Sequence, residues 1–213
     1  PALTLPADVS VEANGVLSTV AIGTATATDI FGATVVNNAP ATYPVGLTVV
    51  TYTATDGNGL VSIGTQNVTV VDTTAPAVTA QLIPLNIGDD DEGKHDDHEG
   101  HGKGMFKVVF SSVDIADPNP ALVGMLNGVT VTNGQIVELK QSRKSKSEFE
   151  HGKLKLKGML FTLNVSATDA SANVGTAAAA FAFPVKHEGR DEHKKDKKHD
   201  KKHDKKHDKG DKD

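Results

Sequence analysis

Short runs of alternating apolar and polar residues fill most of the chain up to residue 185. In the run 47–55, Val50, Tyr52 and Ala54 share one face of an extended strand, while residues 49, 51, 53 and 55 share the other. Val, Ile and Thr are frequent in these runs, as is typical of half-buried strands. The pattern predicts an all-β chain with strands near 7–12, 17–27, 33–36, 47–55, 60–72, 77–83, 105–115, 121–126, 128–132, 135–140, 153–157, 159–168 and 174–184.

Gly, Asn and Asp separate the predicted strands. Asp56-Gly57-Asn58-Gly59, Asn127-Gly128 and Asn133-Gly134 are strong hairpin-turn signals, because these residues tolerate positive φ. Many short strands with frequent turns are typical of β-sandwiches of the immunoglobulin type.

Internal repeats divide the chain. Pro1-Ala2-Leu3-Thr4 recurs as Pro76-Ala77-Val78-Thr79, and the segment 53–58 recurs loosely as 166–171. We therefore predict two tandem immunoglobulin-like β-sandwiches, 1–75 and 76–185, joined at 72–76. The position of Pro1 at a repeat boundary favours a longer tandem array, and a signal-cleavage site is the alternative.

Charge separates further segments. The first 93 residues contain no Lys or Arg. The second sandwich is predicted to carry an acidic, His-bearing insert at 88–104 and a Lys-rich insert at 141–152. Residues 186–213 form a low-complexity tail of Lys, His and Asp, for which disorder is the expectation because nothing in it can be buried.

The first unit resembles the hyalin repeat (HYR) family over residues 1–76. The resemblance is carried by LPADVSVEA at 5–13, TATD at 26–29, YPVG at 43–46 followed by VVTYTATD at 49–56, and VTVVDTTAP at 68–76. It implies a small extracellular β-sandwich. Members of this family usually carry cysteines, and Leu5 and Phe31 stand where cysteines are common.

Apolar contacts are therefore expected to replace the disulfide. This places Phe31 in the core and predicts that Phe31→Ala costs about 3–5 kcal/mol. The other expected core residues of the first sandwich are Val20, Ile22, Val50, Tyr52, Val68 and Val70.

The second unit is similar to bacterial immunoglobulin-like domains, through DIADPNP at 114–120, LNGV at 126–129 and NGQIV at 133–137. This resemblance implies only the fold, because such folds host many functions.

Composition excludes several classes of function. Without cysteine there is no disulfide, thiolate zinc site or Cys nucleophile, and the absence of Trp argues against aromatic platforms for carbohydrate or nucleic acid. No apolar run is long enough to span a membrane. The sequence contains no nucleophile elbow, phosphate loop or HExxH motif. We therefore predict no enzyme, no nucleic-acid partner and no membrane span.

The acidic insert is the first candidate metal site. His95, His98 and His101 recur every three residues among Asp89, Asp91 and Asp96. Imidazole suits Zn, Cu or Ni, and the carboxylates of 89–92 suit Ca²⁺. The tail repeats Lys-Lys-His-Asp and adds His199, His203 and His207. The alternative is that both segments are solvated and bind no metal specifically.

The loops at one end of each sandwich are the second candidate. In immunoglobulin-like folds the B–C and F–G loops meet at the same end. We therefore expect Asp29 to lie near Asp56 and Asn58, and a calcium site in the second unit from Asp114, Asp117, Asn119, Asp169 and Asn173. The alternative is that these residues only cap turns by bonding their own backbone.

These features favour a secreted or cell-surface structural or adhesive module, such as a surface-array or filament subunit, with a protein partner or self-association. The alternative is a secreted metal-sequestering protein that uses the insert and the tail. The Lys-rich segments 140–146 and 186–212 complement the acidic segment 89–99, so any self-association through them should respond to salt and to divalent metal.

Overall fold

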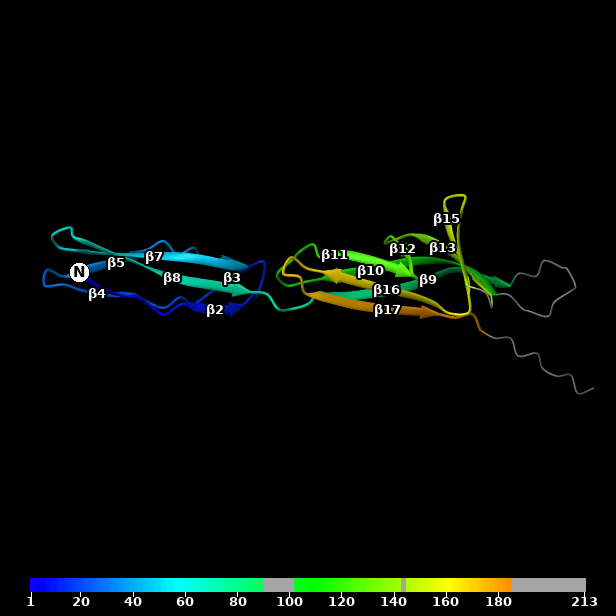
Figure 1. Cartoon of the computed structure of the whole chain (residues 1–213), viewed down its shortest axis with the longest axis horizontal. Helices are drawn as coiled ribbons and strands as arrows, with labels where there is room; N and C mark the ends of the chain where they lie inside the picture. Colours follow the sequence, from blue (N-terminus) through cyan, green and yellow to red (C-terminus); the bar gives the residue numbers. More distant parts are fainter. Residues whose placement is uncertain (90–101, 143–144, 185–213) are drawn as a thin grey trace, which may run out of the picture.

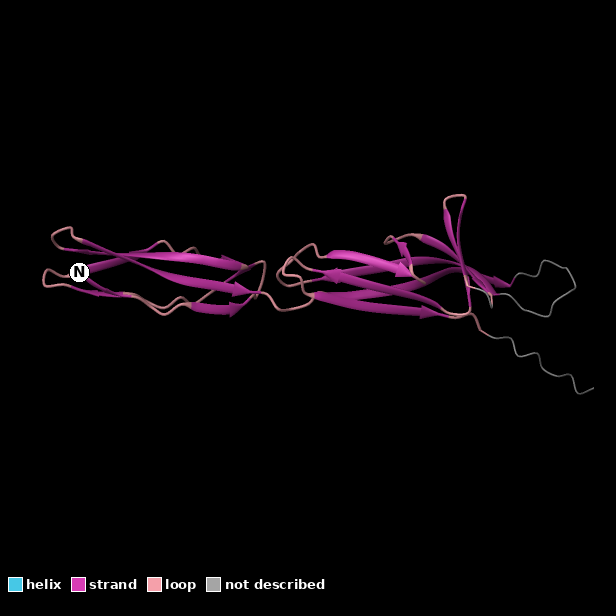
Figure 2. Cartoon of the chain, viewed as in Figure 1, coloured by secondary structure: helices cyan, strands magenta, loops and turns pink. Residues whose placement is uncertain are grey.

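The structure is a computed structural model that describes residues 1–89, 102–142 and 145–184. The described residues form strands joined by turns and loops, so the predicted all-β fold class is confirmed (Figure 2). The strands build two bodies placed end to end along one long axis (Figure 1).

The first body is a sandwich of one four-stranded sheet, in the order β2-β8-β7-β5, and two short strand pairs, β1-β4 and β3-β6. Strand β2 is parallel to β8, and the other pairs are antiparallel. The bounds are β1 Ala2–Thr4, β2 Val9–Glu12, β3 Leu17–Ser18, β4 Thr26–Thr28, β5 Ala33–Asn37, β6 Tyr43–Pro44, β7 Gly46–Asp56 and β8 Val61–Val71.

The second body packs a five-stranded sheet, β14-β15-β13-β10-β9, against a four-stranded sheet, β12-β11-β16-β17. The bounds are β9 Ala77–Asp89, β10 Gly102–Val113, β11 Ala121–Leu126, β12 Val129–Val131, β13 Ile136–Gln141, β14 Lys146–Glu150, β15 Lys153–Gly158, β16 Phe161–Thr168 and β17 Val174–Phe181.

Period-two alternation sets the first core. On β7 the side chains of Val50, Tyr52 and Ala54 are buried, whereas Val49 on the opposite face is exposed. The buried Gln66 of β8 accepts a hydrogen bond from the Tyr52 hydroxyl at 2.8 Å. Its amide nitrogen donates to the carbonyl oxygens of Ala7 and Ile22, at 2.5 and 2.9 Å. One polar side chain thus fixes two irregular segments to the sheet.

The prediction that Phe31 lies in this core is wrong, because its side chain is 59% exposed. Phe31 sits in the turn between β4 and β5, where Asp29 accepts its backbone N–H and Gly32 has a φ of 73°. The turn directs the ring to solvent. Leu5, at the other position where a cysteine is common, does pack against the core.

Phe31→Ala should therefore lower the free energy of unfolding by less than about 1 kcal/mol, as for surface substitutions, and not by the range of a buried aromatic. Urea unfolding of the two proteins measures the difference. A loss above about 3 kcal/mol, the range of a core aromatic, would contradict the exposed position.

The second core is larger and contains an aromatic cluster. Phe106 is fully buried, with its ring centroid 4.5 Å from that of Phe181 and 6.2 Å from that of Phe183. The ring centroid of Phe161 lies 6.1 Å from that of Phe183. Aliphatic side chains of β13 and β15 close the core beside these rings.

Several predicted strand limits are wrong. The run 17–27 forms only the short strands β3 and β4, and Gly23, with a φ of 79°, lies between them. Strands β9 and β10 continue into the predicted acidic insert, with Asp89 paired to Gly102, and Gly102 lies against the ring of Phe183 in the core.

The predicted Lys-rich insert also contains a strand, β14, paired to β15. Ion pairs join the two strands of this hairpin: Lys146 of β14 and Lys157 of β15 pair with Glu148, and Lys155 of β15 pairs with Glu150. The hydrogen bond from Lys146 lowers the pKa of Glu148 and raises that of Lys146.

Candidate metal centre

The connector between the sandwiches, residues 72–76, is fixed to the first one. Glu12, at the end of β2, accepts hydrogen bonds from the backbone N–H of Thr73 at 2.7 Å and from its hydroxyl at 3.1 Å. Asp72 follows β8 directly, and its Oδ1 accepts the backbone N–H of Thr74 at 3.1 Å. Asp and Thr favour such local side-chain-to-backbone bonds, which order the connector.

Two loops of the second sandwich face the connector. Asp114 follows β10, and its Oδ1 accepts the backbone N–H groups of Ala116 and Asp117, both at 2.8 Å. Asp169 follows β16, and its Oδ1 accepts those of Ser171 and Asn173, at 2.9 and 2.8 Å. Each aspartate therefore begins its loop with one carboxylate oxygen used for the turn.

Strand pairing brings these loops to the connector. Val113, the residue before Asp114, pairs with Ala77 at the start of β9. Gly175 on β17 lies so close to this start that a Cβ there would be 1.8 Å from the carbonyl oxygen of Pro76, so only glycine fits without a backbone shift. The β9–β10 pairing and the close approach of β17 to Pro76 thus place both loops beside residues 72–76.

Direct contacts cross the junction. The side-chain amide of Asn173 donates to the carbonyl oxygen of Asp72 at 3.0 Å and to Oδ2 of Asp169 at 3.0 Å. Ala116, in the loop after Asp114, packs against the core of the first sandwich. Both loops of the second sandwich therefore contact the first one or its connector.

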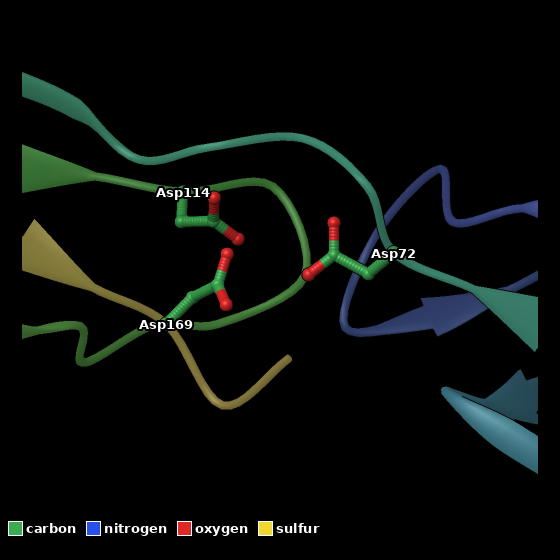
Figure 3. Close-up of side chains that lie close together, drawn as sticks. All are labelled: Asp72, Asp114 and Asp169. Carbon is green, nitrogen blue, oxygen red and sulfur yellow. The ribbon is translucent and has the colours of Figure 1, made fainter. Parts of the chain in front are cut away.

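Three carboxylates meet at this junction. Asp72, Asp114 and Asp169 each present an oxygen, and these oxygens lie within 4.8 Å of one another (Figure 3). Asp72 and Asp169 are only 8% and 6% exposed. Oδ2 of Asp72 and Oδ2 of Asp114 are buried and have no hydrogen-bond partner among the described residues. The cluster therefore combines dense negative charge with unsatisfied acceptors.

Of the predicted calcium ligands, Asp114, Asp169 and Asn173 come together here. Asp117 uses both oxygens on backbone N–H groups, those of Asn119 at 2.8 Å and of Ala170 at 2.9 Å, so it joins the two loops to each other. Asn119 is exposed. Its backbone N–H is the donor to Asp117, so this pair follows the turn-capping alternative.

The first sandwich repeats the same loop at its distal end. Oδ1 of Asp56 accepts the N–H groups of Asn58 and Leu60, at the spacing seen for Asp169 with Ser171 and Asn173. This hydrogen-bonding pattern matches the sequence repeat of 53–58 and 166–171.

Asp29 lies in the neighbouring loop of that end, where Gly57 packs against the backbone of Phe31. It accepts the N–H of Phe31, which lowers its pKa, and the Pro1 ammonium 3.3 Å away adds to this lowering. This pairing is consistent with a turn-capping role.

The other predicted metal ligands fall outside the described residues. They are His95, His98, His101, Asp91 and Asp96 in the insert, and His199, His203 and His207 in the tail. Asp89 is described only by its backbone, as the last residue of β9. The metal predictions for these segments remain predictions.

Asp72 is the one carboxylate of the cluster that the sequence pattern did not predict as a ligand. Its position in the sequence could have indicated this role, because it lies five residues before β9, the strand that opens the second sandwich. In an antiparallel sheet that start lies beside the end of the next strand, where Asp114 follows.

No family model and no curated protein matches this sequence. Among solved structures, the chain is similar to one titled "D00-D0 domain of Intimin", at 15% identity and a TM-score of 0.30, over 85% of this chain and 99% of that one. The fold assignment rests on the sheets described above. In the part of the chain that the structure describes, no helix has the length and apolar character needed to cross a membrane.

Proposed function

We propose that this chain is a structural module of a secreted or cell-surface protein, a spacer that carries tension along its length. The single observation that carries the proposal is the parallel pairing of β2 with β8 in the first sandwich. The extracellular location rests on the resemblance of residues 1–76 to hyalin repeats. The metal-sequestering alternative depends on residues outside the described part of the chain.

The pairing makes the first sandwich suited to load. Strand β2 lies near the start of the chain, and β8 leads directly into the connector. Because the two strands run in the same direction, tension between the ends pulls them in opposite senses along their length. The hydrogen bonds between β2 and β8, from the pair Val9–Val68 to the pair Glu12–Val71, then carry the load together and do not break one at a time.

The arrangement of the sandwiches supports the same role. They lie end to end, so that their lengths add (Figure 1). The connector is short, is bonded to Glu12 and is contacted by Asn173. A spacer needs both an end-to-end arrangement and an ordered connector, because a loose connector would let the two bodies fold back on each other.

Proline substitutions test the load-bearing ladder. Ala13 donates its backbone N–H to Val71, and alternate residues of a strand donate on the same side, so the N–H of Val11 also faces β8. By the same alternation the N–H of Ser10 faces away from β8, on the side where β2 is the edge of its sheet. Val11→Pro therefore removes a ladder bond, whereas Ser10→Pro does not.

The full chain, tethered at both ends and stretched one molecule at a time, should show a separate unfolding event for the first sandwich. Val11→Pro should lower the force of that event clearly, and Ser10→Pro much less. Equal forces for the two variants would refute the load-bearing role of the β2–β8 ladder.

A further inference from the structure

We propose that Asp72, Asp114 and Asp169 form a binding site for one calcium ion, which ties the connector to the end of the second sandwich. The side chains of the junction define this site whether or not the chain bears tension. Only its mechanical consequence depends on the proposed function.

The spacing of the three carboxylates suits a single ion. Calcium binds oxygen at about 2.3–2.6 Å, so oxygens on opposite sides of one ion lie roughly 4.6–5.2 Å apart, and others lie closer. One oxygen from each of the three aspartates falls within a 4.8 Å limit of the others. The three carboxylates therefore lie close enough together to share one ion.

Two carboxylate oxygens at the junction have no hydrogen-bond donor among the described residues. Oδ1 of Asp72 and Oδ1 of Asp114 already accept backbone N–H groups, which fix the orientation of each carboxylate. Oδ2 of each is buried without a donor among the described residues. A buried carboxylate oxygen without a partner is costly, and three carboxylates in one place also repel each other. A bound cation removes both penalties.

The chain itself offers no cation from the first sandwich. The first 93 residues contain no lysine or arginine. The Pro1 ammonium forms an ion pair with Asp29, at the opposite end of that sandwich from Asp72. A positive charge for Asp72 therefore has to come from outside this sandwich, and a free ion can reach the partly exposed side of Asp114.

The donor set selects the class of ion. All three ligands are carboxylates, which favour hard cations such as Ca²⁺ and Mg²⁺ over the transition metals that suit imidazole or thiolate. Mg²⁺ requires near-ideal octahedral geometry at about 2.0–2.1 Å, whereas Ca²⁺ accepts irregular shells completed by water. Three aspartates from separate segments, each held by its own turn, favour the more tolerant ion.

The origin of the ligands gives the ion its effect. Asp72 belongs to the connector, whereas Asp114 and Asp169 belong to the two end loops of the second sandwich. An ion bound to all three adds a second attachment beside the hydrogen bond from Asn173 to Asp72. Bending between the two sandwiches should therefore decrease when calcium binds.

Asp72→Asn is the direct test, because asparagine keeps an oxygen for the N–H of Thr74 and replaces the other oxygen by an uncharged amide group. The matched control is Asp56→Asn, which changes a buried aspartate with the same kind of loop bonding but outside the cluster. The full-length proteins are stripped with chelator and titrated with CaCl₂ by calorimetry, with MgCl₂ and ZnCl₂ in parallel runs.

The wild type should bind one more equivalent of Ca²⁺ than Asp72→Asn, and Asp56→Asn should match the wild type. Because both proteins keep the insert and the tail, calcium or zinc bound there cancels in the difference. Asp114→Asn should lose the same equivalent, which gives a second variant if Asp72→Asn folds poorly.

Thermal unfolding supplies the second readout. In chelator, Asp72→Asn should be at least as stable as the wild type, because it relieves repulsion. In millimolar Ca²⁺ the order should reverse, because only the wild type is stabilised by binding. Identical calcium binding by both proteins, or a loss of stability in Asp72→Asn that is equal with and without calcium, would overturn the site. Neither result would bear on the β2–β8 ladder.

Discussion

Phe106→Ala is expected to lower the free energy of unfolding of the second sandwich by about 3–5 kcal/mol, the range for truncating a fully buried aromatic. Phe106 has no exposed surface and contacts the rings of Phe181 and Phe183, so its removal leaves a cavity between the two sheets. Chemical denaturation followed by circular dichroism measures the loss. The transition of the first sandwich should stay where it is.

Phe149 provides the matched control. It is an aromatic of the same sandwich but is 68% exposed on β14, so Phe149→Ala should change stability by no more than about 0.5 kcal/mol. Similar losses for the two variants would mean that the aromatic cluster does not hold the two sheets together.

Gln66→Leu should destabilise the first sandwich by more than about 2 kcal/mol, because a buried polar group left without a partner costs about 1–3 kcal/mol and two part-buried carbonyl oxygens also lose their donor. The substitution nearly conserves volume but removes the partners of three groups, namely the Tyr52 hydroxyl and the carbonyl oxygens of Ala7 and Ile22. Equilibrium unfolding in urea measures the effect.

Tyr52→Phe separates the contributions. It removes only the bond from the hydroxyl to Gln66, so the loss should stay near 1–2 kcal/mol, roughly the cost of one unsatisfied acceptor. If Gln66→Leu costs no more than Tyr52→Phe, the two carbonyl oxygens have other partners, and Gln66 does not fix the irregular segments.

Period-two alternation predicted the core where one face of a strand is buried. Val50 and Tyr52 follow this rule because β7 lies in the middle of its sheet, with one face on the core. Phe31 was placed in the core by the resemblance to hyalin repeats and not by alternation, and this failed because the residue lies in a turn, where backbone geometry sets the side-chain direction. Composition also misled at 88–104, since β9 and β10 continue as a ladder there and the glycines of β10 lie against the rings of Phe106 and Phe183.

Two of the three carboxylates of the candidate site could be predicted from the sequence. Asp114 and Asp169 each follow a strand, and the fold class alone brings those two loops to the same end. Asp72 belongs to a connector, and the position of a connector depends on contacts that cross between the sandwiches, such as those of Asn173 and Ala116. The order of apolar and polar residues along the chain does not reveal those contacts.

The junction also has a consequence for the order in which the protein acquires its shape during synthesis. All strands of the first sandwich have been made once Val71 emerges, and domains generally fold from the N-terminus as units. The backbone carbonyl oxygen of Asp72, however, receives a hydrogen bond from Asn173, which is 101 residues further along the chain. The two bodies are therefore hinged while the second is being made, and the hinge closes only when the loop between β16 and β17 forms.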